Sequence, residues 1–257
     1  MSYWEDPKNT TGLCWGRQPS ISVLEENPSI CLKVILSKSL RGTFVERVGR
    51  IAEAEGIPVE RADIKVLDKL SGEEKHQGII IKIKPTDPLI LGDLLAELDT
   101  ADSCLLIVLD HIQDPQNLGA IIRTAEASGA SGVIFPTKRA SSPNGTVIKT
   151  SAGSALRVPL IGVVNISRTL SDLKKKAFWV VGLDQNTERD IWAEKMPSKL
   201  ALVVGSEGHG LSRLVSETCD ELRRIPMKGH IASLNASVAA AIGMYEWSRT
   251  FMGSVDS

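Results

Sequence analysis

The chain has 257 residues, of which 42% are hydrophobic and 24% charged, which is ordinary for a globular protein that buries a core. The formal net charge of −1 excludes a polycation that would hold nucleic acid by charge alone, so any contact with RNA must come from local patches. No run approaches the roughly 18 apolar residues of a membrane span, and we expect neither a membrane protein nor a secretory signal.

The four cysteines are scattered along the sequence without the C-x-x-C spacing of a zinc site. They do not suggest a disulfide framework either, which favours a reducing compartment. We therefore expect a cytoplasmic protein that needs no metal. The cysteines are Cys14, Cys31, Cys104 and Cys219.

The first part of the chain predicts a small α/β domain behind a polar arm. Residues 1–15 are expected to form a flexible arm, and residues 16–84 a domain that lies within the usual size range. Apolar periodicity and glycine or proline breaks predict its elements. These are helices at 17–26, 44–55 and 64–70, and strands at 32–36, from 58, and at 78–83.

Two prolines, Pro85 and Pro88, open a linker that we extend with a first helix through residue 100. Residues 101–257 then alternate between strands and helices, which predicts an α/β domain with a parallel sheet covered on both faces. The expected strands are 104–110, 132–135, 158–163, 178–183, 200–204 and 223–225. The expected helices are 89–98, 118–128, 147–155, 166–176, 211–218 and 236–251.

Two stretches near the end of the chain predict a binding site. The apolar run 200–204 breaks into a loop with Gly205, Gly208 and Gly210, and the stretch from Ile225 passes through a polar loop to a helix opening at Asn235. We expect two adjacent strand ends to bring both loops to one edge of the sheet, where ligands bind in open α/β folds. The glycine spacing is not the G-x-G-x-x-G dinucleotide fingerprint, which disfavours a nucleotide-dependent oxidoreductase.

Each candidate residue also has a purely structural interpretation. The glycines can serve turns that need positive φ, and Asn235 or Ser233 can cap the last helix. Asn117 can be the N-cap of the helix that it precedes, Arg123 can pair with Glu126 on the same helix, and Glu207 can be solvated.

Three motifs occur together, each after a predicted strand: Asn117-Leu-Gly-Ala-Ile-Ile-Arg123-Thr-Ala, Gly205-Ser-Glu207-Gly-His-Gly-Leu, and Ile225-Pro-Met-x-Gly followed by Ser233-Leu-Asn235-x-Ser237. In this order and spacing, the chain resembles the SpoU/TrmH branch of the SPOUT methyltransferases over residues 104–245. These enzymes methylate the ribose 2′-hydroxyl of RNA with S-adenosylmethionine. One departure is Ala236, where the family more often has Val, and we expect it to affect packing only.

The N-terminal part resembles, more weakly, the small RNA-binding domain of the ribosomal-RNA members of this family. The matching pieces are Gly16-Arg17, Val23-Leu-Glu25 and His76-Gln-Gly78. For the whole chain the resemblance implies a C-terminal trefoil knot, a rare exception to the rule that chains are unknotted, and an obligate homodimer. It also implies a cofactor site formed by Leu183, Gly205, Ile225, Met227 and Leu234.

The same resemblance implies catalytic roles for Arg123, Asn117, Glu207, Ser233 and Asn235. Because a guanidinium stays protonated, we favour Arg123 as the group that grips the target phosphate and stabilises the developing alkoxide, oriented by Glu207. A phosphate oxygen or water would take the proton, and methyl transfer from a sulfonium needs no metal. His209 and His230 flank the site, and we rank them second as bases.

The expected substrate is a guanosine of large-subunit ribosomal RNA. Transfer RNA, or a ribosomal-RNA adenosine methylated for antibiotic resistance, remains an alternative, as does an RNA-binding protein that has lost catalysis. The last helix is apolar nearly all round, which independently favours a homodimer. We expect RNA to contact basic side chains of both domains: Lys33, Lys38, Arg41, Arg47 and Arg50 in the first, and Lys138, Arg139 and Arg157 in the second.

Overall fold

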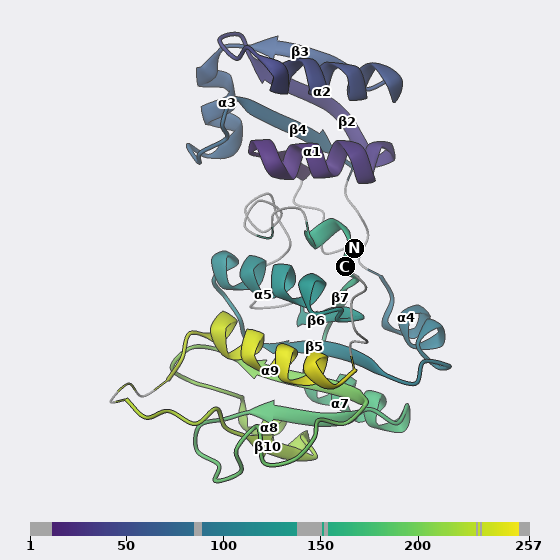
Figure 1. The fold of residues 1–257 in the computed structure, drawn as a ribbon, viewed down its shortest axis with the longest axis vertical. Helices are drawn as coiled ribbons and strands as arrows, with labels where there is room; N and C mark the ends of the chain where they lie inside the picture. Colours follow the sequence, from purple (N-terminus) through teal and green to yellow (C-terminus); the bar gives the residue numbers. More distant parts are fainter. Residues whose placement is uncertain are drawn as a thin grey trace. The chain divides into compact units, whose positions relative to one another are not determined.

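The structure is a computed structural model that describes residues 12–84, 89–137, 151, 154–229, 231 and 233–251. The chain divides into two compact units, one of residues 1–87 with 143–156 and one of residues 88–142 with 157–257 (Figure 1). In the described ranges, no helix is long and apolar enough to cross a membrane.

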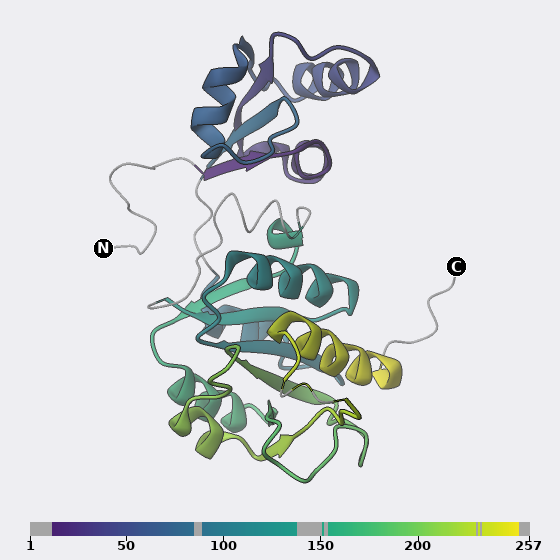
Figure 2. The same ribbon diagram turned by 90° about the vertical axis from the view of Figure 1, so that its left-hand side faces the viewer.

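The N-terminal unit is built on a four-stranded mixed sheet with the order β1-β4-β2-β3. β4 runs antiparallel to both β1 and β2, whereas β2 and β3 are parallel. Helix α3 lies on one side of the sheet, and α1 and α2 lie on the other (Figure 2). The elements are β1 Gly12–Trp15, α1 Arg17–Glu26, the 3₁₀ helix η1 Pro28–Ile30, β2 Cys31–Ser37, α2 Thr43–Ala54, β3 Val59–Ala62, α3 Ile64–Ser71 and β4 Ile79–Ile83.

The expectation that residues through 15 form a flexible arm is wrong for the last of them. Gly12–Trp15 is a strand whose partner, β4, lies more than sixty residues further along the chain. Cys14 and Trp15 are buried, which fixes this strand in the core. A four-residue strand carries almost no periodicity, so its long-range partner is invisible in the local sequence.

The C-terminal unit is built on a six-stranded sheet with the order β10-β8-β9-β5-β6-β7, and every pairing in it is parallel. The predicted α/β class with a parallel sheet is therefore confirmed. Its elements are α4 Leu91–Glu97, β5 Cys104–Asp110, α5 Pro115–Ala127, β6 Gly132–Pro136, β7 Leu160–Val163, α7 Ile166–Lys175, β8 Trp179–Leu183, β9 Lys199–Gly205, α8 Arg213–Thr218, β10 Glu221–Arg223 and α9 Ala236–Phe251, whereas the 3₁₀ helix η2 Ser154–Leu156 belongs to the first unit.

Helices cover both faces of this sheet. One face packs against α4, α7 and α8, with Leu106 and Val203 in the same apolar cluster as Leu170. α5 and α9 lie side by side on the opposite face (Figures 1 and 2). Because both faces are covered, every residue of β5 is buried, which explains its continuous apolar run.

Two details of this unit differ from expectation. β8 lies between β9 and β10, so the strand ends that carry the two loops are not adjacent. Strand order depends on long-range packing that one sequence does not report, but in a parallel sheet all the carboxyl ends still share one edge. Helix α5 starts at Pro115, with the Asp114 side chain accepting a hydrogen bond from the Gln116 N–H (3.0 Å), so Asp114 and not Asn117 is its N-cap. Most of the expected helix 147–155 lies outside the described residues.

Candidate active site

A cavity of about 300 Å³ opens at the carboxyl edge of the parallel sheet, beside the ends of β8 and β9. Four of the five predicted cofactor residues line it, namely Leu183, Gly205, Ile225 and Leu234, and Ser233 lines it as well. Met227 is half-buried and is not among the lining residues. The remaining wall comes from Asp184, Gln185, Asn186, Val204, Ser206, Glu207, Gly208, His209, Gly210, Ala236 and Ala239.

The glycines of the loop after β9 are required by its geometry. Ser206 and Gly210 exchange two backbone hydrogen bonds of 3.1 and 2.9 Å, which fold the loop back on itself. A Cβ on Gly205 would lie 2.2 Å from the Gly210 carbonyl carbon, and Gly208 and Gly210 have φ of +80° and +64°. The glycines therefore set the loop conformation, and this conformation places Glu207 in the lining of the cavity.

Three segments that are far apart in sequence meet at Glu207. One Glu207 oxygen, Oε1, accepts hydrogen bonds from the Asn117 amide (3.0 Å), the Asn235 amide and the Ala236 N–H (3.3 Å). The Asn235 amide also donates to Oδ1 of Asn117 at 2.9 Å, which closes a triangle. The predicted convergence of Asn117, Glu207 and Asn235 is what the structure contains.

Asn235 has a structural role as well. Its Oδ1 accepts hydrogen bonds from the Ser237 N–H at 2.9 Å, the Ser237 hydroxyl at 2.5 Å and the Val238 N–H at 3.4 Å. The residue is therefore the N-cap of α9 through its oxygen and part of the Glu207 cluster through its amide.

A second cavity, of about 550 Å³, lies on the other side of the same loop. It shares Ser206, Glu207, His209 and Gly210 with the first cavity, so Glu207 stands in a common wall. Its remaining lining residues are His111, Ile112, Gln113, Asp114, Asn117 and Ser212. Two adjoining cavities with a carboxylate between them can hold two reactants side by side.

Arg123 lies on α5 and is exposed. The alternative interpretation, in which Arg123 pairs with Glu126, is not what the structure contains, because both Nε and Nη2 of Arg157 bind the Glu126 carboxylate, the latter at 2.9 Å. Within the described ranges, Arg123 has no hydrogen bond or ion pair, and none joins it to Glu207. Orientation of Arg123 by Glu207 stays a prediction. His209 lines both cavities, whereas His230 lies outside the described residues.

Comparison with known proteins decides the family. Residues 104–245 match the SpoU rRNA Methylase family, and residues 13–89 match the RNA 2′-O ribose methyltransferase substrate binding family. The chain belongs to the SpoU rRNA methylase family.

Two curated relatives of this SpoU methylase carry the same name, 23S rRNA (guanosine-2′-O-)-methyltransferase RlmB. The protein from Pectobacterium atrosepticum is 38% identical over 88% of this chain and 92% of its own length. The protein from Photobacterium profundum is 42% identical over 74% and 78%. In fold, the chain is similar to the SpoU methyltransferase AviRb from Streptomyces viridochromogenes in complex with the cofactor AdoMet. That structure has a TM-score of 0.76 and 22% identity, over 95% of this chain and 91% of AviRb.

The cavity wall that follows β8 contains polar residues of this SpoU methylase that were not among the predicted site residues. Asp184 accepts hydrogen bonds on Oδ1 from the Asn186 N–H (2.8 Å) and the Asn186 side chain (3.0 Å), and both residues line the first cavity. A polar turn directly after an apolar strand, at the carboxyl edge of the sheet, was the available signal.

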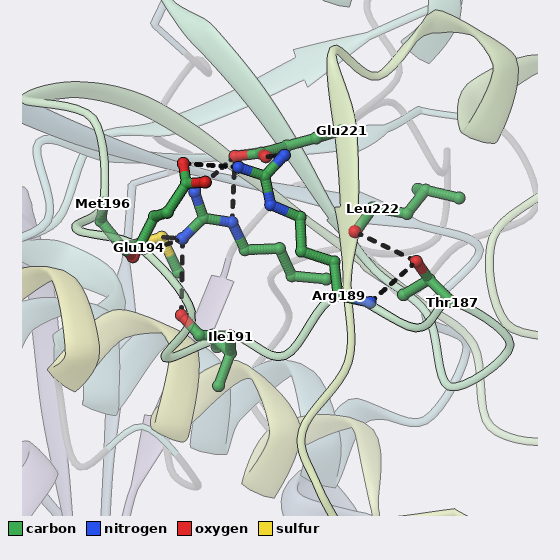
Figure 3. A network of polar contacts seen from close by, with 8 residues as sticks. Thr187, Arg189, Ile191, Glu194, Met196, Glu221 and Leu222 are labelled. Atoms are coloured by element: carbon green, nitrogen blue, oxygen red, sulfur yellow. Dashed lines mark hydrogen bonds and ion pairs between the residues drawn. The ribbon is translucent and has the colours of Figure 1, made fainter.

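The loop that continues from this wall is fixed to β10 by an ionic network whose Arg223 and Glu221 side chains are largely buried and whose Arg189 and Glu194 side chains are exposed. Arg223 is 2% exposed and lies 2.6 Å from Oε1 of Glu221, and it donates to the Glu194 carbonyl at 2.9 Å. Arg189 joins Glu221 and Glu194 at 2.6 and 2.5 Å, with the three side chains pointing toward one another (Figure 3). Nothing in the local pattern of a short strand end predicted that Arg223 is buried.

The His76-Gln77-Gly78 motif of the substrate-binding part forms a local hydrogen-bonded structure. The Gly78 N–H donates to Nδ1 of His76 (3.0 Å), so the other ring nitrogen carries the proton and donates to Asp68 (2.9 Å). The Arg17 N–H donates to Oε1 of Gln77 at 2.8 Å, which joins two of the three pieces of the predicted family match.

The basic side chains expected to contact RNA are mostly ion-paired in this structure. Three in the N-terminal unit pair with exposed carboxylates, as Lys33–Glu60, Lys38–Asp63 and Arg47–Glu25. Arg41 donates to the carbonyl groups of Lys38 and Leu40. Exposed pairs of this kind contribute little to stability, so these side chains can exchange their partners for phosphates at low cost. Lys138 and Arg139 lie outside the described residues.

Proposed function

We propose that this protein transfers a methyl group from S-adenosylmethionine to the ribose 2′-hydroxyl of a guanosine in 23S ribosomal RNA. The observation that carries the proposal is the hydrogen-bonded cluster of Asn117, Glu207 and Asn235, in which Glu207 lines both cavities. Family membership supports the reaction class, and the names of the RlmB relatives support the RNA and the base.

The first cavity suits S-adenosylmethionine. Its volume is at the small end of the range typical of ligand sites, roughly 300–1,000 Å³. Small residues and main-chain groups of the loops after β8 and β9 line it, and these can recognise an adenine edge without long side chains. Asp184 and Glu207 offer negative charge to a cationic ligand. The AdoMet complex of AviRb, which has a similar fold, agrees with this assignment.

S-adenosylmethionine supplies an activated methyl group, so the enzyme's task is to align and deprotonate a weak nucleophile. We assign Arg123 to the phosphate beside the target ribose and to the developing negative charge on its oxygen. Its exposed guanidinium, without a partner in the described part of the chain, is available for that role. Asn117 and Asn235 hold the Glu207 loop, and Ser233 contributes to the cofactor wall.

A trefoil knot is the finer fold that we propose for the C-terminal unit. The loop from 184 to 198 wraps the end of β10: the Ile191 N–H donates to the Arg224 carbonyl, and the Arg224 N–H to the Arg189 carbonyl, both at 2.8 Å. A chain end that passes beside such an enclosing loop before it forms α9 is what a knotted SPOUT domain requires.

We also propose a homodimer that acts in the cytoplasm. Val238 and Tyr245 lie seven residues apart on α9, hence on one face, and are 46% and 52% exposed. An apolar stripe on the last helix fits a second copy of the chain. A ribosomal substrate fits the cytoplasm. Residues 16–84 would bind the RNA and residues 101–257 would carry out the transfer.

The proposal is tested by mapping 2′-O-methyl groups in total RNA from cells with and without the gene for this protein. A single 23S guanosine that loses its methyl group is the expected result. If a transfer RNA or a 23S adenosine loses a methyl group instead, that RNA is the substrate and the proposed one is wrong. If the map is unchanged and the purified protein fails to methylate 23S RNA, the proposed methyltransferase activity is refuted.

A further inference from the structure

An Asp–His pair, Asp110 and His111, lies at the end of β5, outside the three family motifs. Nδ1 of His111 lies 2.6 Å from Oδ1 of Asp110. Asp110 is 1% exposed, and its second oxygen accepts the Ser212 N–H at 2.6 Å. The carboxylate is thus held on both oxygens, while the side chain of His111 remains 45% exposed.

This contact fixes the hydrogen on the imidazole. A carboxylate only accepts hydrogen bonds, so a neutral His111 must carry its proton on Nδ1 and leave Nε2 with a free lone pair. The same arrangement, a buried carboxylate behind a histidine, prepares the general base of many hydrolases.

His111 is also held in an unusual backbone conformation. Its φ is +60°, a region that residues other than glycine rarely occupy. Such strain persists only where the surroundings enforce it, and it concentrates at functional sites. Here the residue with this conformation lines the second cavity, whose wall also contains Asn117 and Glu207.

We propose that His111 is the proton acceptor of the methyl transfer and that Asp110 is the positioning residue behind it. The inference rests on the proposed function. As the ribose O–CH₃ bond forms, the 2′-O–H bond breaks and its proton goes to Nε2 of His111. The bonding pair of the old S–CH₃ bond stays with the sulfur of the donor. The imidazolium that results is stabilised by Asp110 and releases the proton to solvent through the open side of the cavity.

The charged groups that face His111 favour this assignment. Besides Asp110, the cavity wall holds the carboxyl groups of Asp114 and Glu207, together with His209. Among the residues that the structure describes, no lysine or arginine lines this cavity, so the described groups around the imidazolium are mainly anionic. His209 lies in the glycine-rich loop and, in the described chain, has no carboxylate partner, which distinguishes the two histidines.

The test is the pH dependence of single-turnover methyl transfer to a 23S RNA transcript with saturating S-adenosylmethionine. The pH profile of the wild type should have an acid limb, in which the rate falls tenfold for each unit that the pH is lowered. His111→Asn keeps a residue that tolerates positive φ and can donate to Asp110, but it has no basic nitrogen. We expect it to lower the rate about 10²–10⁴-fold and to abolish the acid limb. Binding of S-adenosylmethionine by calorimetry should change by less than about threefold.

The matched control is His209→Asn, which should keep the acid limb whatever its rate. If His111→Asn retains the wild-type rate and limb, or if His209→Asn loses the limb, the inference is overturned. A wild-type protein that transfers no methyl group at any pH would overturn the proposed function as well, so the two failures are distinguishable.

A second measurement requires no activity. In ¹⁵N spectra, neutral His111 should carry its proton on Nδ1, and the opposite tautomer in the wild type would overturn the inference. Asp110→Asn presents an amide that can donate to Nδ1, so the ring should switch to the Nε2-protonated form. If that variant does not fold, the wild-type spectrum decides alone.

Discussion

Two glutamates of the C-terminal unit each join distant segments, and their partners differ in kind. Glu221 is bound through both oxygens by the guanidinium groups of Arg223 and Arg189. Glu207 is bound through one oxygen by two neutral amides and a backbone N–H, and it has no cationic partner in the described ranges. Both fix a loop, but among the described residues only Glu221 has cationic side chains that compensate its charge.

The difference is what we expect between a structural carboxylate and the functional one that we propose. A compensated, buried ion pair has little charge left for a ligand, and its loss is felt as lost stability. A carboxylate held by neutral donors keeps its charge at the cavity wall, where a cationic ligand can use it. Substitution of either carboxylate, or of a residue that serves as its comparison, tests this contrast.

The largest effect should follow from Glu221→Gln. The substitution leaves Arg223, which is 2% exposed, without its anionic partner in the core. We expect the free energy of unfolding to fall by about 3–5 kcal/mol in urea titrations. A loss below about 1 kcal/mol would mean that the network is dispensable and that the contrast with Glu207 fails.

Arg123→Ala should act on catalysis alone. We expect the rate of transfer to fall by about 10²–10³, the loss typical for removal of a group that stabilises developing charge. Because Arg123 is exposed and unpartnered in the described chain, stability should stay within about 0.5 kcal/mol. Full activity in a folded variant would remove Arg123 from the mechanism.

Glu207→Gln should have an intermediate effect on ligand binding. Gln keeps an oxygen for the donors of the cluster but removes the charge, so the dissociation constant for S-adenosylmethionine should rise by about tenfold, or about 1.4 kcal/mol. Calorimetry measures this directly. Unchanged affinity would show that the charge of Glu207 does not reach the cofactor cavity.

The smallest effect should come from Glu60→Gln, the matched control for Glu221→Gln. The Lys33–Glu60 pair has a similar length, 3.0 Å, but its side chains are 40% and 54% exposed. Solvent screens such a pair, so the free energy of unfolding should change by only about 0–1 kcal/mol. A loss as large as that of Glu221→Gln would show that burial is not what separates the two networks.

Much of the C-terminal unit could be predicted because its signals are local. The bounds of β5 and α9 agree with the observed Cys104–Asp110 and Ala236–Phe251. The run of β5 is buried on both faces, and α9 opens directly after its Asn235 cap. The start of α5 was predictable too, since Asp114-Pro115 is an N-cap followed by a first-turn proline. The predicted helix nevertheless begins at residue 118, because Asn117 is also a possible N-cap.

What could not be predicted depends on contacts across the fold. The expected strand 223–225 is β10 at Glu221–Arg223, where a buried arginine, Arg223, and a partly buried Glu221 replace the usual apolar strand pattern. The position of β8 between β9 and β10 is set by packing. At the site, the motifs predicted Asn117, Glu207 and Asn235, whereas the role proposed for His111 could not be predicted, because it depends on the contact with Asp110 and on a cavity that only the folded chain forms.

The cap of α9 has a consequence for cooperativity. Asn235 uses its oxygen to begin the last helix and its amide to hold Glu207, so the helix cannot fray at its first turn without loosening the site. A ligand that rigidifies the Glu207 loop should therefore slow hydrogen exchange of amides deep in α9. A second protein copy that binds this helix more tightly when the site is ordered would in turn raise the affinity for the ligand, and assembly and ligand binding would then be reciprocally linked.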